Sequence, residues 1–443
     1  CYPSTYFAPN THLLGEGAAL FFLGTLYPQF AAPWRETGWR IVEREMERQV
    51  RDDGFHFEQS LYYHVYALDM FRHARLLAGR NAVAVDPAFD HKLDRMFEAL
   101  ASVSHAGAPP RFGDDDGGRW FNPRRNRGPH LLDPLVRTEE ALWLRAPAPA
   151  PLPQPASRAF PASGLYLMID PGWQLAIDAG PHGFGNGGHG HADALSLQLA
   201  ASGREGLVDP GTGSYMQPDT PERFRSTAAR GREWLVDPGT GSYMQPDVRE
   251  RFRSTAAHNT LEADGRSQAR PAGPFAWRAM PTVSVTQWRS TPEFDFLCAR
   301  HDGYAPVIHQ RQVLRGPGFW LVRDVALGDG VHDLAIHWHF APDLKVEGGV
   351  ATAPGGATLA LLTAGDWSQS LIAGEYSPAY GIVEPAPVLR FHRRTELPAE
   401  LVTVIAPGCA IQSVRALGDA FELTGPANRW RVTLGDNPRV DSI

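Results

Sequence analysis

Residues 186–199 read NGGHGHADALSLQL, so two histidines and an aspartate lead directly into an apolar run. In an extended strand, side chains two positions apart lie on the same face. This predicts one face that changes from polar to apolar and consists of His189, His191, Asp193, Leu195, Leu197 and Leu199. The polar end is predicted to be a functional site at the rim of a core. The alternative is a pair of half-buried histidines satisfied by ordinary polar contacts.

The composition is that of a globular protein with more than one domain. The 443 residues suffice for two or more sizeable cores, and 43% hydrophobic with 21% charged residues is ordinary for a soluble protein. A formal net charge of −7 gives no reason to expect a nucleic-acid partner, so an anionic polymer would need local positive charge. The widely spaced Cys1, Cys298 and Cys409 make neither a disulfide framework nor a thiolate metal site.

Targeting signals are not visible in the sequence. No apolar run is long enough for a membrane-spanning helix, and no signal peptide is recognisable. The chain begins with CYPSTYFAPN and carries no initiator methionine, so we expect an upstream segment to be missing. The missing signal therefore gives no argument for a cytoplasmic location.

The periodicity of apolar residues changes along the chain. A three-to-four spacing predicts helices within residues 14–28, 33–53, 60–79 and 91–103, and Thr138 begins a last short helix. From Gly164 onward, runs such as LYLMID, WQLAID and ELVTVIA alternate with period two between Gly, Pro and Asp breaks. Helices followed by strands indicate two separate domains rather than an alternating α/β sheet.

These patterns define the expected domains. We expect a helical domain over residues 1–144, a Pro/Ala-rich linker over 145–160, and an antiparallel β-sandwich domain over 161–443. An internal repeat lies in the last of these, because residues 203–229 recur almost unchanged at 231–257. Two copies are too few for a solenoid, so we interpret the repeat as a local duplication of which one copy fills the structural position.

Several residue types could carry chemistry. His191, His258 and the aspartate of a DPGTGSY segment (Asp237, or Asp209 in the other copy) suit zinc, which accepts imidazole and carboxylate ligands. The alternative for this set is ordinary polar contact in the core. The loop at 111–130 holds three carboxylates and five arginines, and we interpret it first as a solvated loop and second as a carbohydrate-contacting one. His337 and His339 are expected to be structural or rim residues.

Taken together, the segments NTHLLGEGAAL, DDGFHFEQSLYYHVYAL, FGDDDGG, GHGHADALSL, LVDPGTGSY and FRSTAAHNTLEADG resemble the heparinase II/III-like polysaccharide lyases, which include oligo-alginate lyases. The order of these motifs makes the resemblance specific, and it covers most of the chain. It implies an α+β multidomain fold in which an incomplete N-terminal (α/α) toroid precedes an antiparallel β-sandwich. It also implies an active site in the cleft between the two.

The resemblance implies β-elimination at a uronic acid. Such a reaction needs donors that neutralise the C6 carboxylate, a base at C5 and an acid at the leaving O4. The implied catalytic residues are His12 with Asn10 near the carboxylate, Tyr63 as proton donor and possible base with Tyr66 or Tyr62 as alternatives, and His189 facing the substrate. The implied ligands of one mainly structural zinc ion are His191, Asp237 (or Asp209) and His258. The implied substrate contacts are Tyr243 (or Tyr215), Arg119 and Gln59.

The expected function is therefore that of a polysaccharide lyase that gives an unsaturated uronate product. Its expected partner is an anionic poly- or oligosaccharide, without nucleic acid or a membrane span, and oligomers are possible. We expect a periplasmic or secreted location. The alternatives are a non-catalytic or inactivated uronan-binding homologue and, less favoured by the order of helices and strands, a metal-dependent hydrolase.

Overall fold

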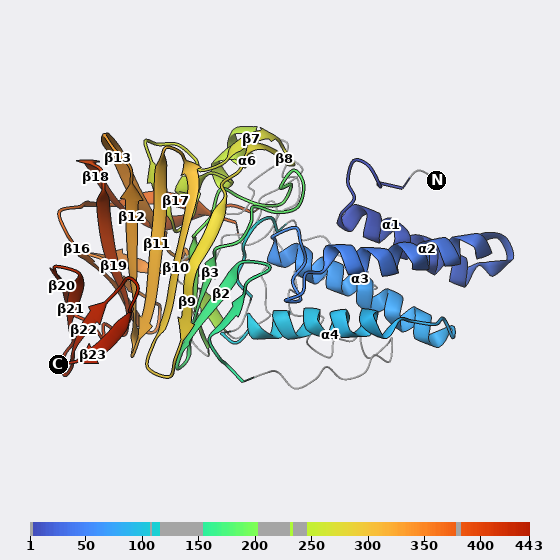
Figure 1. The fold of residues 1–443 in the computed structure, drawn as a ribbon, viewed down its shortest axis with the longest axis horizontal. Coiled ribbons are helices and arrows are strands. Elements are labelled where there is room, and N and C mark those ends of the chain that lie inside the picture. The colour runs from blue at the N-terminus through green and yellow to red at the C-terminus, as the bar shows by residue number, and fades with distance from the viewer. Residues whose placement is uncertain (1–2, 107–108, 116–153, 203–230, 234–245, 378–381) are drawn as a thin grey trace.

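The structure is a computed structural model that describes residues 3–106, 109–115, 154–202, 231–233, 246–377 and 382–443. In Figure 1 the helices within residues 11–102 gather at one end of the molecule and the β-strands fill the other. The predicted order of helices first and strands second is therefore confirmed for these residues.

Three of the four helices described within residues 11–102 begin next to a residue whose side chain caps the first turn. Their bounds are α1 Thr11–Leu26, α2 Pro28–Gln49, α3 Leu61–Arg80 and α4 Pro87–Ser102. Asn10, Ser60 and Asp86 accept a hydrogen bond from a backbone N–H of the first turn of α1, α3 and α4. The helices expected within residues 14–103 are confirmed, whereas the one expected from Thr138 lies outside the described residues. None of the described helices is both long and apolar enough to cross a membrane.

The hairpin of α1 and α2 depends on glycines where the two helices touch. A Cβ on Gly38 would lie 2.3 Å from the backbone nitrogen of Phe21 and 2.5 Å from the carbonyl oxygen of Gly17. A Cβ on Gly24 would lie 2.2 Å from the backbone nitrogen of Arg35. Because these neighbours are backbone atoms, a larger residue would force the helices apart.

A sheet that we call the junction sheet connects the helices to the rest of the molecule (Figure 1). In order, its antiparallel strands are β1 Arg158–Phe160, β2 Leu165–Asp170, β3 Trp173–Asp178, β4 Leu197–Ser202 and β5 Gly231–Glu233. The run LYLMID alternates between two cores: Leu165 and Leu167 pack with the helices, whereas Tyr166 and Met168 pack with the other sheets. Since β1 begins at Arg158, the last residues of the expected linker 145–160 belong to a sheet; residues 145–153 lie outside the described part.

The largest described sheet, here the central sheet, is antiparallel throughout. In spatial order its strands are β14 Lys345–Glu347, β15 Val350–Thr352, β16 Thr358–Ala364, β19 Ala399–Pro407, β12 Phe319–Leu327, β11 Val307–Gly316, β10 Asp295–Tyr304 and β9 Val283–Ser290. One face packs against the junction sheet and against the sheet β17 Ser368–Tyr376, β18 Glu384–Glu396, β13 Val331–His339 and β6 Leu261–Ala263. The other face packs against β20 Ser413–Leu417, β21 Ala420–Thr424, β22 Arg429–Thr433 and β23 Arg439–Ser442.

Shorter elements lie between the junction sheet and the central sheet in the chain. They are the helix α6 Pro246–Phe252, the 3-10 turn η1 Thr255–Ala257 and the hairpin of β7 Arg270–Gly273 with β8 Ala276–Ala279. The residues of the repeat that the structure describes all belong to the second copy. The expected antiparallel architecture is thus confirmed for the described strands, because every strand pair is antiparallel and the sheets pack face to face.

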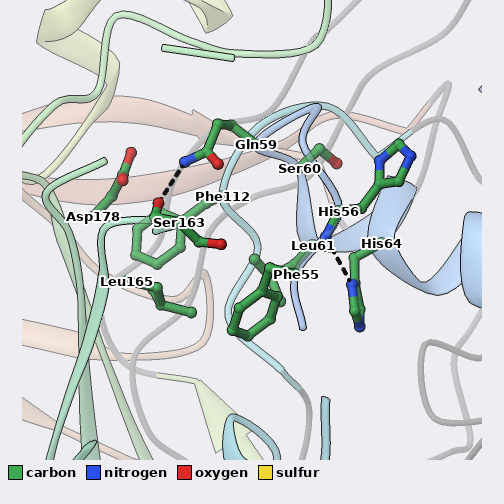
Figure 2. Close-up of a pocket in the computed structure, with 10 residues that line it drawn as sticks. All are labelled: Phe55, His56, Gln59, Ser60, Leu61, His64, Phe112, Ser163, Leu165 and Asp178. Carbon is green, nitrogen blue, oxygen red and sulfur yellow. Dashed lines mark hydrogen bonds between the residues drawn. The ribbon is translucent and has the colours of Figure 1, made fainter. Parts of the chain in front are cut away.

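A small pocket marks the contact between the helical part and the junction sheet (Figure 2). Two hydrogen bonds join residues that line it: the Gln59 amide donates to the carbonyl oxygen of Ser163 at 2.9 Å, and the His64 Nδ1 accepts from the backbone N–H of His56 at 3.2 Å. The other ring nitrogen of His64 lies 3.2 Å from the carbonyl oxygen of Met96, which fixes a neutral tautomer. Burial lowers the pKa of His64 to about 4. We interpret this pocket as a packing gap at the junction.

The substitution Gly38→Ala tests the glycine contact of the helix hairpin. We expect it to lower the free energy of unfolding by about 1–3 kcal/mol, because the added methyl meets backbone atoms of α1. Gly79→Ala is the matched control, since Gly79 is exposed in α3 and only the end of the Arg75 side chain lies near its Cβ. That control is expected to be neutral or to stabilise by up to about 1 kcal/mol. Denaturant unfolding followed by circular dichroism measures both, and equal effects of the two variants would contradict the hairpin contact.

Candidate active site

The two histidines of the motif GHGHAD lie in a loop, residues 186–196, that we call the histidine loop. It is the last part of the connection between β3 and β4, and β4 begins only at Leu197. Leu195 adopts a positive φ of 62°, so the predicted strand over residues 189–199 is wrong in its first part. The burial of Leu195, Leu197 and Leu199 is confirmed, because each is fully buried.

The glycine between the histidines is required by a close approach. A Cβ on Gly190 would lie 2.0 Å from the carbonyl oxygen of His182. Farther along the loop, side chains hold the backbone carbonyls of Ala192 and Ala194. Thr255 donates to the first at 2.8 Å and Thr260 donates to the second at 3.1 Å. The loop is therefore fixed by the segment that also carries His258.

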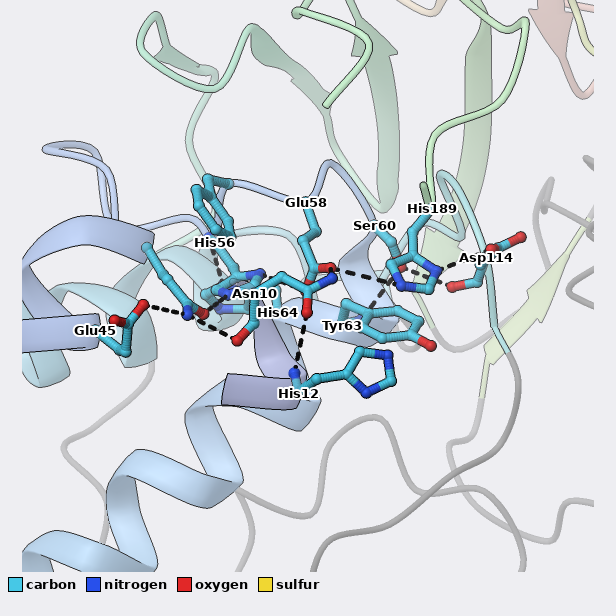
Figure 3. A network of polar contacts seen from close by, with 12 residues as sticks. Asn10, His12, Glu45, His56, Glu58, Ser60, Tyr63, His64, Asp114 and His189 are labelled. Carbon is cyan, nitrogen blue, oxygen red and sulfur yellow. Dashed lines mark hydrogen bonds and ion pairs between the residues drawn. The ribbon is translucent and has the colours of Figure 1, made fainter. Parts of the chain in front are cut away.

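His189 meets the helical part at Tyr63. The two rings stack with their centroids 3.7 Å apart and their planes at 21°. Tyr63 stands in the first turn of α3, where its backbone N–H donates to the capping Ser60 hydroxyl at 3.1 Å. Figure 3 shows the stack within a network of polar residues from both parts of the chain. The tyrosine that the resemblance implied and the first histidine of the motif are thus in direct contact.

Asp114 connects the two histidines of the loop. One carboxylate oxygen lies 3.0 Å from Nδ1 of His189, and the other lies 2.9 Å from Nε2 of His191. Burial alone raises the pKa of Asp114, but the hydrogen bonds and charges of the two imidazoles lower it to about 2. Asp114 therefore stays ionised and fixes the orientation of both rings.

A second carboxylate lies on the other side of His189. Glu58 Oε1 is 3.5 Å from His189 Nε2 and accepts a hydrogen bond from the Asn10 amide at 2.6 Å. Burial raises the pKa of Glu58, although His189 and Thr11 act in the opposite direction. Asn10 also caps α1 by accepting from the backbone N–H of His12 at 3.1 Å. The exposed His12 side chain extends toward the hydroxyl end of Tyr63 in the view of Figure 3.

A possible metal site adjoins this network. His191, Asp193 and His258 are buried, and one ligand atom of each lies within 4.8 Å of the others. Burial and the neighbouring Asp178 raise the pKa of Asp193 to about 7. Two imidazoles and a carboxylate form a donor set that suits zinc, and a cation there would offset the charge of a buried carboxylate. Asp114 on His191 gives the carboxylate–histidine pair that orients metal-binding imidazoles.

Other predicted site residues are placed as follows. Gln59 points into the junction, where it accepts from Arg51 at 2.6 Å and donates to Ser163. The Tyr66 ring lies edge-on to Tyr63 with centroids 6.1 Å apart. Asp209, Tyr215, Arg119, Asp237 and Tyr243 lie outside the described residues. His339 is a buried strand residue whose Nε2 bonds the carbonyl oxygen of Ala256 at 2.9 Å, as a structural role requires.

The prediction of a solvated loop at 111–130 is wrong for the residues that the structure describes there. Asp114 and Asp115 are buried, and Asp115 pairs with Arg111 at 2.9 Å. Sequence reasoning gave no role to Asp114 or Glu58, which both contact His189. In the sequence these two residues are marked only by the family-like motifs that contain them, FGDDDGG for Asp114 and DDGFHFEQ for Glu58.

Comparison with known proteins gives matches over both parts of the chain. The profile described as Heparinase II/III N-terminus matches residues 2–119, and that described as Heparinase II/III-like, C-terminal matches residues 152–230 and 229–402. The two C-terminal stretches meet where one copy of the repeat ends and the next begins.

Relatives of similar sequence include two heparin-sulfate lyases. The one from Pedobacter heparinus is 27% identical over 367 residues, which cover 77% of this chain and 48% of that protein. The one from Bacteroides stercoris is 28% identical over 224 residues, which cover 48% of this chain and 32% of that protein. The chain thus spans about half the length of these curated relatives, or less.

Solved structures agree with the fold. A heparan sulfate lyase from Pedobacter heparinus superposes with a TM-score of 0.70 at 21% identity, covering 99% of this chain and 67% of the other. A heparinase III superposes with a TM-score of 0.73 at 16% identity, covering 96% and 67%. Since the C-terminal profile alone matches more than half of the sequence, the chain belongs to the heparinase II/III-like family.

Proposed function

We propose that this chain is a polysaccharide lyase that cleaves a uronic-acid-containing glycosaminoglycan of the heparan sulfate type by β-elimination. The observation that carries the proposal is the contact of Tyr63 with His189, 3.7 Å between ring centroids, at the meeting of the helical part and the junction sheet. The similarity to heparin-sulfate lyases supports the substrate class. The expectation that the helices form part of an (α/α) toroid, and that the protein is periplasmic or secreted, belongs to the same proposal.

The reaction removes the C5 proton of the uronate and breaks the bond to the O4 leaving group. Tyr63 supplies a phenol that can give a proton to O4 and, as a phenolate, take the proton from C5. The neighbouring His189 can donate to the substrate carboxylate or stabilise a phenolate. Its orientation is already fixed by Asp114 at Nδ1. This support from a buried carboxylate favours a preorganised site.

Asn10 and His12 are proposed to face the substrate carboxylate. Asn10 is held by Glu58, and His12 is exposed at the start of α1, on the same side of the network as Tyr63 (Figure 3). Neutralising the carboxylate makes the C5 proton more acidic, because the electron pair released at C5 is delocalised into that group. Both residues are therefore proposed to assist the removal of the C5 proton.

We also propose that one zinc ion binds His191, His258 and a carboxylate. Zinc at this position would neutralise the buried carboxylate and tie the histidine loop to the His258 segment, a mainly structural contribution. Among the described residues Asp193 is the carboxylate close to both histidines, whereas the sequence motif favoured Asp237 or its twin Asp209, which lie outside those residues. The two assignments are separable by substitution.

The substitution Tyr63→Phe tests the catalytic assignment. We expect turnover to fall by about 10²–10⁴-fold, because the phenolic proton is lost while the ring that stacks on His189 is kept. We expect the turnover of His12→Ala and of His189→Ala to fall by a similar factor. The measurement is the ultraviolet absorbance of the conjugated double bond formed from heparan sulfate, heparin or alginate.

Tyr166→Phe is the control for this test, because Tyr166 is a buried tyrosine that packs against Trp288 in another core. Near-normal turnover of both Tyr63→Phe and His12→Ala would contradict the assignment. If only Tyr66→Phe loses turnover, the acid–base role belongs to Tyr66. Sugar binding by the wild-type protein without unsaturated product would favour the inactivated homologue.

Metal analysis after dialysis tests the zinc proposal. About one equivalent of zinc per chain is expected in the wild-type protein, and little in His191→Ala or His258→Ala. Asp193→Asn is expected to release zinc, whereas Asp237→Asn and Asp209→Asn are expected to retain it. The reverse pattern would restore the ligand set predicted from the sequence, and a wild-type protein without metal would contradict the zinc site itself.

A further inference from the structure

We propose that the β7–β8 hairpin, residues 270–279, is a substrate-binding arm that stacks Phe275 on a sugar ring and holds acidic groups of the polysaccharide with Arg270 and Arg278. This inference rests on the proposed function and adds a binding element to it. None of the three residues was singled out by the sequence motifs. Phe275 is 47% exposed although it is a large apolar side chain.

The hairpin places Phe275 beside the candidate catalytic residues. Its ring lies edge-on to His189, with centroids 6.0 Å apart. Tyr63 stacks on the same imidazole ring with the centroids 3.7 Å apart, so His189 contacts both aromatic side chains. A pyranose ring bound at the Tyr63–His189 pair could therefore extend onto Phe275, and the flat apolar face of an aromatic ring suits the C–H groups of a sugar.

The hairpin is fixed to the histidine loop rather than free to move. The Trp277 indole N–H donates to the carbonyl oxygen of Gly190 at 3.1 Å, and its backbone N–H donates to that of Asn186 at 3.1 Å. The guanidinium of Arg253 lies 4.6 Å from the Trp277 ring and donates to the carbonyl oxygen of Pro274 at 2.8 Å. The backbone on both sides of Phe275 is therefore fixed, so the hairpin loses little conformational entropy when a ligand binds.

The charge of the hairpin is opposite to that of the chain. Residues 265–292 contain no aspartate or glutamate, in a protein with a formal net charge of −7. Arg270 and Arg278 are exposed, and within the described residues neither forms an ion pair. Guanidinium groups bind carboxylate and sulfate in a bidentate manner. The hairpin thus supplies the local positive charge that an anionic polymer requires.

Three variant proteins test the arm with heparan sulfate as the probe. Phe275→Ala is expected to raise KM, and the dissociation constant from affinity electrophoresis, roughly tenfold, with Phe275→Trp close to wild type. Arg270→Gln/Arg278→Gln is expected to raise both roughly fivefold at low salt, and the difference should shrink at high salt. In all of them kcat should stay within about twofold, because the contacts bind ground state and transition state alike.

Arg415→Gln/Arg431→Gln is the matched control, since it removes the same charge from exposed positions of β20 and β22 at the other end of the molecule (Figure 1). Unchanged KM and affinity in the Phe275→Ala protein, or equal effects of the two arginine pairs, would overturn the arm. Affinity is measured separately from turnover. If the wild-type protein binds heparan sulfate without forming product, the lyase function is contradicted, and the affinities of the hairpin variants still test the substrate-binding arm. If the wild-type protein does not bind, both proposals are overturned.

Discussion

One buried carboxylate, Asp114, determines the geometry of the candidate site. Its two oxygens bond His189 and His191, its backbone N–H donates to the carbonyl oxygen of His189 at 3.0 Å, and its own carbonyl oxygen accepts from Ser60 at 2.7 Å. Ser60 also caps α3 and so sets the position of Tyr63. A single residue therefore ties the start of α3 to the histidine loop, and removing it would leave two buried imidazoles without their common acceptor.

The central sheet also holds the histidine loop in place. Arg311 on β11 donates to the carbonyl oxygens of Leu195 at 2.6 Å and Asn259 at 2.7 Å, and it pairs with the buried Asp324. One guanidinium thus joins the segment of His191 and Asp193 to that of His258. The positive φ of Leu195 is sustained by this bond, because a strained backbone persists only where its surroundings fix it. The proposed metal ligands are held in place from the core of the molecule.

Periodicity predicted the parts of the fold whose side chains follow a regular repeat. The helices within residues 14–103 and strands such as LYLMID and WQLAID were found, because a buried face imposes a spacing on the sequence. The loops carry no such repeat. The sequence therefore predicts a solvated Asp114 and a strand from His189, whereas Asp114 is buried and β4 begins at Leu197. Tyr63 and His189 were identified through motifs, whereas their contact depends on chain segments more than a hundred residues apart. Phe275 had neither period nor motif to mark it.

The charges around the site explain how carboxylates and a polyanionic substrate can share it. Asp114 is compensated by two imidazoles, and burial raises the pKa of Glu58, which favours its neutral form. Asp115 pairs with the Arg111 guanidinium, and Asp193 lies where a cation could bind with His191 and His258. The basic hairpin adjoins a site in which Asp114 and Asp115 have basic partners. An anionic sugar can approach such a site without the repulsion that the net charge of the chain would otherwise impose.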